Sequence, residues 1–250
     1  MLRAAVTGTV FASPSVKQIS SCVSRCGTGS AGVLLVVMNY TGDVLHFGLA
    51  TEKARTMDMA AAGAVEMVVV GDDVGVGRSR SGRVGRRGMA GTVLVHKTAG
   101  ALAATGATLA QCAALARLVA ANLVTLGASL ARVHIPGSAT LDDHDGGVLG
   151  PDEMELGMGI HNERGCRRMP VPRDVGELVD TMLRQLLDEG DADRNYLGCS
   201  GGRMRRGLEV VLLINNLGGV SPLELGAITA EVTERLCTHL PVVWYGWLAD

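Results

Sequence analysis

Short apolar runs alternate with helix-like segments in the first part of the chain. Residues 32–38 (GVLLVVM) form an apolar run bounded by Gly and Asn39, and residues 65–70 (VEMVVV) form a second, largely apolar run that ends at Gly71. Continuous apolar runs of this length are typical of strands that are buried on both faces, as in a parallel sheet. The segment between them, residues 51–62, has a helical composition. This order predicts a βαβ unit with a right-handed crossover.

Helical patterns fill the next part of the chain. Residues 91–102 begin apolar and become helical, and residues 109–130 predict one or two helices rich in Ala and Leu. A Pro-Gly-Ser sequence at residues 136–138 then ends the pattern. Residues 139–151 (ATLDDHDGGVLGP) are acidic and rich in glycine, which favours a linker.

After this linker, strand-like and helical segments alternate again. Their order is strand, helix, strand, helix, over residues 153–160, 175–187, 208–214 and 221–236. We therefore expect an α/β protein of two domains joined by the linker at residues 139–151. The first domain, residues 1–138, has a mainly parallel sheet, and the second, residues 152–250, is a smaller α/β domain.

Composition excludes several protein classes. Hydrophobic residues make up 47% of the chain and charged residues 19%, unlike a disordered protein. The net charge of −2 excludes a strongly basic nucleic-acid-binding protein. Neither a signal peptide nor an uninterrupted apolar run of about 18 residues is present, so no membrane span is expected. The six cysteines are scattered without a CxxC spacing, which favours reduced thiols in an intracellular protein, and without an evident targeting tail the cytoplasm is the default location.

Residues 75–88 (GVGRSRSGRVGRRG) form a basic, glycine-rich loop. One interpretation is a phosphate-contacting loop. However, the third glycine of a dinucleotide fingerprint is misplaced and the P-loop pattern is lacking. We therefore interpret these residues as a mobile surface excursion and expect no nucleotide site there.

Three polar constellations stand at the ends of predicted strands. They are residues 39–43 (NYTGD), residues 155–163 (ELGMGIHNE) and residues 213–219 (LINNLGG). Ligands of open α/β sheets bind beyond the carboxyl ends of strands, which makes each run a candidate site.

Each constellation has two interpretations. Asp43 is either a base that accepts a substrate proton or a helix cap. His161 is either a structural histidine or a base, nucleophile or metal ligand, with flanking glycines that admit a ligand. The Asn-Asn and Gly-Gly pairs of residues 215–219 form either a structural turn or a lining of the site.

These runs occur in an order that resembles one family, the substrate-binding K subunit or K domain of dihydroxyacetone (glycerone) kinases. The resemblance covers residues 1–236 and is nearest to the animal-type ATP-dependent triokinase/FMN cyclases. Further motifs carry it between and around the three constellations: residues 11–15 (FASPS), 69–73 (VVGDD), 85–88 (GRRG), 91–92, 96–97 and 136–138.

The resemblance implies a DhaK-like fold and a chemical mechanism. In the family, a histidine that matches His161 adds to the substrate carbonyl carbon and forms a hemiaminal. Asp43 matches an aspartate that acts as a base on the attacking hydroxyl. The substrate is dihydroxyacetone or glyceraldehyde, the family's K units form homodimers, and ATP with Mg²⁺ is supplied by an L domain. The resemblance places no cofactor-binding or metal-binding residue in this chain.

The chain also departs from the family pattern. Met38 stands where the family has a substrate-binding lysine, and a thioether donates no hydrogen bond. Asn162 and Arg164 replace the Gly and Pro that surround the glutamate after the family histidine. A Gly-Ser-Gly-His-Glu-Pro loop is missing, as in an N-terminally and C-terminally truncated relative. These departures leave an alternative, a non-catalytic K-like regulatory paralogue or an inactive truncated copy.

Overall fold

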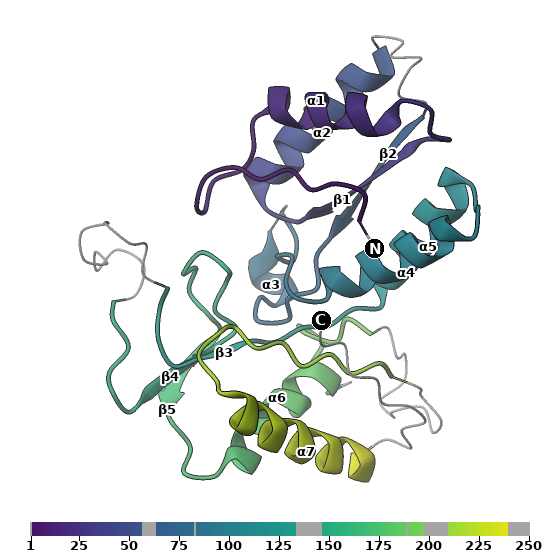
Figure 1. Ribbon diagram of the computed structural model, residues 1–250. Helices are drawn as coiled ribbons and strands as arrows, with labels where there is room; N and C mark the ends of the chain where they lie inside the picture. The colour runs from purple at the N-terminus through teal and green to yellow at the C-terminus, as the bar shows by residue number, and fades with distance from the viewer. Residues whose placement is uncertain are drawn as a thin grey trace.

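A two-stranded parallel sheet lies at the centre of the first half of the molecule (Figure 1). The computed structural model describes residues 2–56, 64–82, 84–133, 147–188, 190–197 and 210–239. Strand β1 (Val33–Met38) pairs in parallel with β2 (Val65–Val70), and the register runs from Val33 opposite Val65 to Met38 opposite Val70. Helix α2 (Thr41–Thr56) lies between them in the chain. The predicted βαβ order is confirmed.

Helices cover both faces of this sheet, which explains why its strands are almost entirely apolar, with Glu66 as the exception. On one face, Val33 and Leu35 of β1 pack with α1 (Val16–Gly27) and α2. On the other, Leu34 and Val36 pack against α4 (Thr92–Ala104) and α5 (Leu109–Ala121). Successive side chains of a strand point to opposite faces, so the positions of β1 from Val33 to Val36 meet helices on alternate faces.

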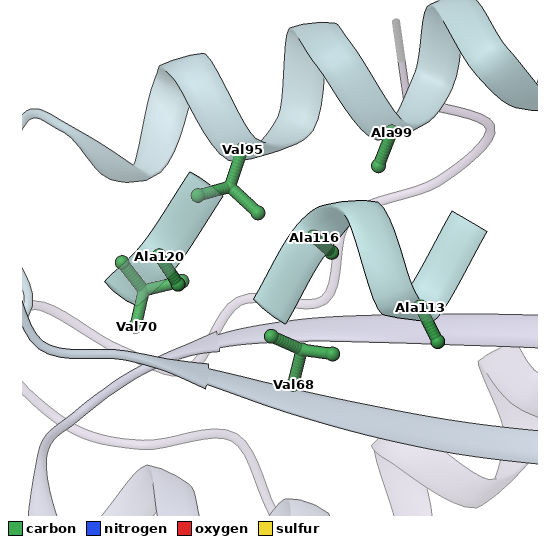
Figure 2. Packing of buried hydrophobic residues seen from close by; sticks show 7 residues of the cluster. All are labelled: Val68, Val70, Val95, Ala99, Ala113, Ala116 and Ala120. Atoms are coloured by element: carbon green, nitrogen blue, oxygen red, sulfur yellow. The ribbon is translucent and has the colours of Figure 1, made fainter. Parts of the chain in front are cut away.

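The core between β2, α4 and α5 is built from small side chains (Figure 2). Val68 and Val70 point from β2 toward the helices, and five residues of the helices meet them: Val95, Ala99, Ala113, Ala116 and Ala120. Alanine on the inner face of α5 lets this helix approach the strand closely. An interior packed in this way has no room for larger side chains.

The starts of two helices differ from the sequence prediction. Helix α1 was not expected, although Ser15 and Gln18 form a capping box in which Gln18 N–H donates to Ser15 Oγ at 3.3 Å. Helix α2 begins at Thr41 rather than at residue 51, because the polar run after β1 continues directly into the helix. Residues 57–62 of the predicted helix lie outside the described residues.

A three-stranded antiparallel sheet lies below the parallel sheet in Figure 1. Its order is β3 (Ala128–Ser129), β4 (Glu153–Leu156) and β5 (Arg167–Pro170). The helical pattern predicted to reach residue 130 therefore ends at Ala121, and β3 follows it. The predicted strand at residues 153–160 ends at Leu156, because Gly157 adopts a left-handed φ of +72°.

Two helices and an extended segment form a third apolar cluster. Helices α6 (Val175–Leu187) and α7 (Pro222–His239) pack through Val179, Leu183 and Leu236. The prediction of a strand over residues 208–214 is wrong for residues 210–214, which form no strand. Val210 and Leu212 pack instead against the two helices, which cover these apolar side chains without strand pairing.

The glycine-rich loop at residues 75–88 lies at the surface in its middle, as predicted, and is buried at its ends: residues 78–80, 82, 84 and 85 are exposed, whereas residues 75, 77 and 88 are buried. It contains the short helix α3 (Arg78–Ser81). The guanidinium groups of Arg78 and Arg86 lie 4.2 and 4.1 Å from the centre of the Tyr196 ring. These cation–π contacts connect the loop to a segment more than a hundred positions later in the chain.

Two other sequence predictions concern regions with incomplete coverage. Residues 136–138 and most of the expected linker, 139–151, lie outside the described residues, so the domain boundaries stay predictions. In the part of the chain that is described, no helix has the length and apolar character that crossing a membrane requires.

The close packing of α5 predicts that Ala116→Leu is destabilising. Ala116 is fully buried, so the added atoms force neighbouring side chains apart, and we expect a loss of about 1–3 kcal/mol in the free energy of unfolding. Chemical denaturation measures this loss. The matched control is Ala114→Leu on the exposed face of the same helix, with an expected change within about 0.5 kcal/mol. Equal stability of the two variants would contradict the packing described here.

Candidate functional site

The polar run after β1 leads directly into the first turn of α2. The N–H of Asn39 donates to the carbonyl of Val70 (2.8 Å), and its side-chain amide donates to the carbonyls of Val84 and Arg86, each at 2.7 Å. Asp43 lies within the first turn of α2 rather than at the N-cap, so it does not take the capping position that one interpretation gave it. Its negative charge there is stabilised by the helix dipole.

Met38, the last residue of β1, lies beside Gly88. A Cβ atom at Gly88 would come within 2.7 Å of the Met38 Cβ, so only glycine permits this approach. The thioether offers no hydrogen-bond donor at the end of the strand. Of the three candidate site residues, Met38 and Asp43 therefore belong to the same strand end.

His161 lies on the turn that follows β4. Glu163 holds it at two points: its Oε1 lies 3.0 Å from His161 Nδ1, and its Oε2 accepts the backbone N–H of His161. A carboxylate only accepts hydrogen bonds, so in the neutral imidazole this contact assigns the proton to Nδ1. Nε2 then keeps a free lone pair. With its side chain 29% exposed, the ring remains accessible.

Two aromatic rings place His161 next to the end of β1. The ring centre of Tyr40 lies 4.7 Å from that of His161, and the ring centre of Phe11 lies 5.0 Å away in an edge-on arrangement. Burial raises the pKa of the Tyr40 phenol, and the nearby Glu163 charge raises it further, so the phenol is neutral beside the imidazole. Through Tyr40, the first and second polar constellations form one site.

Phe11 holds its place with an uncommon backbone conformation. Its φ is +56°, in the left-handed region that large residues rarely adopt. Such conformations persist where surrounding structure fixes them, and they occur often at functional sites. Phe11 was not predicted to be a site residue.

Two carboxylates that follow β2 are fully buried. Asp72 accepts hydrogen bonds from the N–H groups of Met89 (2.6 Å) and Gly91 (2.9 Å) and from the hydroxyl of Thr125 (2.5 Å). These donors come from the start of α4 and from the segment after α5. Asp72 therefore anchors two distant segments at the end of β2.

Asp73 forms an ion pair with Arg87. Arg87 Nε donates to Asp73 Oδ2 at 2.7 Å, and the N–H of Gly75 donates to Asp73 Oδ1 at 2.6 Å. Burial raises the pKa of Asp73, and the adjacent Arg87 charge opposes this rise. Both residues lie in the family-like motifs, but their pairing was not predicted, because no local pattern links them.

The third constellation forms a local turn before α7. The side-chain amide of Asn216 donates to the carbonyl of Val220 (2.7 Å), and its oxygen accepts the N–H of Gly218 (2.8 Å). Gly218 has a φ of +97°, as such a turn requires. These bonds support the interpretation of residues 215–219 as a structural turn.

The candidate site contains an imidazole and a carboxylate. In the neutral form of His161, Nε2 carries the free lone pair, and Asp43 lies one helical turn beyond Tyr40. Within the described ranges, no group of three or more His, Cys, Asp or Glu side chains could hold a metal ion.

Comparisons with known proteins identify relatives over nearly the whole chain. A family model for the Dak1 domain matches residues 1–244. The dihydroxyacetone kinase of Komagataella pastoris is 48% identical over 253 residues, covering 97% of this chain and 40% of that protein. The human triokinase/FMN cyclase is 43% identical over 236 residues, covering 94% of this chain and 38% of that protein.

A solved structure agrees with these relatives. The dihydroxyacetone kinase of C. freundii, in its native form, matches with a TM-score of 0.74 and 38% identity, over 96% of this chain and 39% of that one. The chain thus spans about 40% of the length of these relatives. The α/β fold and the resemblance to dihydroxyacetone kinases and triokinases are confirmed, and the chain belongs to the Dak1 domain family.

Proposed function

We propose that this chain is the substrate-binding region of a glycerone kinase and captures dihydroxyacetone or glyceraldehyde on His161. The observation that carries the proposal is the contact of Glu163 with His161 Nδ1, which leaves Nε2 free to act as a nucleophile. The site lies at the carboxyl end of β1, next to the turn that holds Asp43. The names of the relatives support the choice of substrate.

In the proposed capture step, His161 Nε2 forms a bond to the carbonyl carbon of the substrate. The π electrons of the carbonyl move to its oxygen, which takes up a proton from solvent water. The ring releases its Nδ1 proton, for which the Glu163 carboxylate is the adjacent acceptor, so the hemiaminal is neutral. Such an adduct discriminates carbonyl compounds from glycerol, which has no electrophilic carbon.

Asp43 is proposed to accept the proton of the substrate hydroxyl that is phosphorylated. ATP and Mg²⁺ are proposed to be held by an L domain outside this chain, and none of the described residues is assigned a part in holding them. By family resemblance, we also propose a homodimer located in the cytoplasm.

We expect His161→Ala to abolish adduct formation. The measurement is ¹³C NMR of dihydroxyacetone labelled at its carbonyl carbon, whose signal moves from the ketone region to that of a tetrahedral carbon when the hemiaminal forms. The parent chain shows the new signal and the variant does not, because alanine has no nucleophilic nitrogen. His96→Ala, on α4, is the control and retains the adduct. An unchanged adduct signal in His161→Ala would refute covalent capture on this residue.

Met38→Lys tests the alternative of a regulatory or inactive copy. An ammonium group at the end of β1 can donate to a substrate oxygen, and a charged hydrogen bond is worth about 1.5–3 kcal/mol. We therefore expect dihydroxyacetone to bind at least about 10-fold more tightly, measured by the same NMR titration. Val69→Lys adds the same charge on the exposed side of neighbouring β2 and serves as control.

A phosphoryl-transfer assay distinguishes the proposed kinase role from the regulatory alternative. With an L domain supplied in trans, the proposed kinase role predicts transfer to dihydroxyacetone. Binding without transfer, in both the parent and Met38→Lys, would favour the regulatory paralogue.

A further inference from the structure

Arg87 connects the parallel sheet to the turn that carries His161. Its Nη2 lies 2.6 Å from Asp73 Oδ2 and donates to the carbonyl oxygen of Gly157 at 2.6 Å. Asp73 follows β2, and Gly157 follows β4. One guanidinium group therefore links the ends of two strands that belong to different sheets.

This connection is enclosed by the protein. The side chain of Asp73 is fully buried, and that of Arg87 is only 14% exposed. Beside it, Gly75 and Gly157 meet backbone to backbone, since a Cβ atom at Gly75 would lie 2.7 Å from the Gly157 Cα. An ion pair so well shielded from solvent is weakly screened, and its geometry is strongly held.

The same turn is held again two residues later. A Cβ atom at Gly159 would lie 2.6 Å from Arg87 Nη1 and 2.1 Å from Glu163 Oε2, so the backbone passes closely between these two side chains. Glu163 in turn binds both the ring and the N–H of His161. A displacement of the backbone at Gly157 or Gly159 would therefore move the imidazole.

We propose that Arg87 is a positioning residue for His161. It holds the turn after β4 against the end of β2, and this keeps the imidazole facing Tyr40 and the first turn of α2. Arg87 acts through Gly157 and has no contact with the substrate in this role. The inference rests on the proposed function, in which His161 is the nucleophile.

Arg87→Lys tests this role. Lysine keeps the positive charge opposite Asp73 but lacks the planar fork that serves two acceptors at fixed angles. We expect the apparent affinity for labelled dihydroxyacetone in the adduct to fall by about 10- to 100-fold, because a small displacement of a reacting group has an effect of this size. We also expect the nuclear Overhauser effect between the His161 and Tyr40 ring protons to be lost. The control is Arg86→Lys. Arg86 donates to the carbonyl of Leu123 rather than to that of Gly157, so we expect this variant to leave both readouts unchanged.

Adduct formation and a ring contact equal to those of the parent in Arg87→Lys would overturn the proposal. If the parent chain itself forms no adduct, the proposed function fails, whereas the ring contact still decides whether Arg87 positions His161. If Arg87→Lys does not fold, the double variant Asp73→Asn with Arg87→Met removes both charges and keeps an acceptor for the Gly75 N–H. The adduct signal and the contact between the His161 and Tyr40 rings are then measured for the double variant, and values equal to those of the parent would again overturn the proposal.

Discussion

The burial of two adjacent carboxylates after β2 is the constraint on which the site depends. Asp72 and Asp73 are both fully buried, and a buried carboxylate without donors is costly by several kcal/mol. Later segments of the chain must therefore supply hydrogen-bond donors at this point. These donors are the backbone N–H groups before α4, the hydroxyl of Thr125 and the guanidinium of Arg87. Satisfying these two groups fixes the glycine-rich loop, the start of α4 and the turn after β4.

The site arises where this constraint meets the geometry of parallel strands. The carboxyl ends of β1 and β2 lie side by side, so the turn after β1 opens beside Asp73. Arg87 brings the turn after β4 to the same edge, and Tyr40 contacts His161 there. His161, on the turn after β4, contacts Tyr40, and Asp43 lies in the first turn of the helix that begins directly after Tyr40. The proposed capture of a small carbonyl compound rests on this arrangement.

The parallel sheet could be predicted from sequence because its strands are apolar at every position except Glu66 and are covered on both faces. The strand predicted at residues 208–214 is wrong for residues 210–214, where Val210 and Leu212 of the apolar run pack on helices instead of pairing with a strand. His161 and Asp43 could be predicted as site residues because each follows a predicted strand. The contacts that position them could not be predicted, since the contact of Arg87 with Gly157 spans 70 positions and depends on tertiary packing. The proposed substrate follows from the family resemblance and could not be predicted from the pattern of polar and apolar residues.

The most direct test of this account is a crystal structure of the chain with dihydroxyacetone. The account predicts continuous electron density between His161 Nε2 and the central carbon of the ligand, with that carbon tetrahedral and Glu163 still within hydrogen-bond distance of Nδ1. A planar ketone held without a covalent bond, a bond formed at Nδ1, or ligand density away from the turn between β1 and α2 would contradict it.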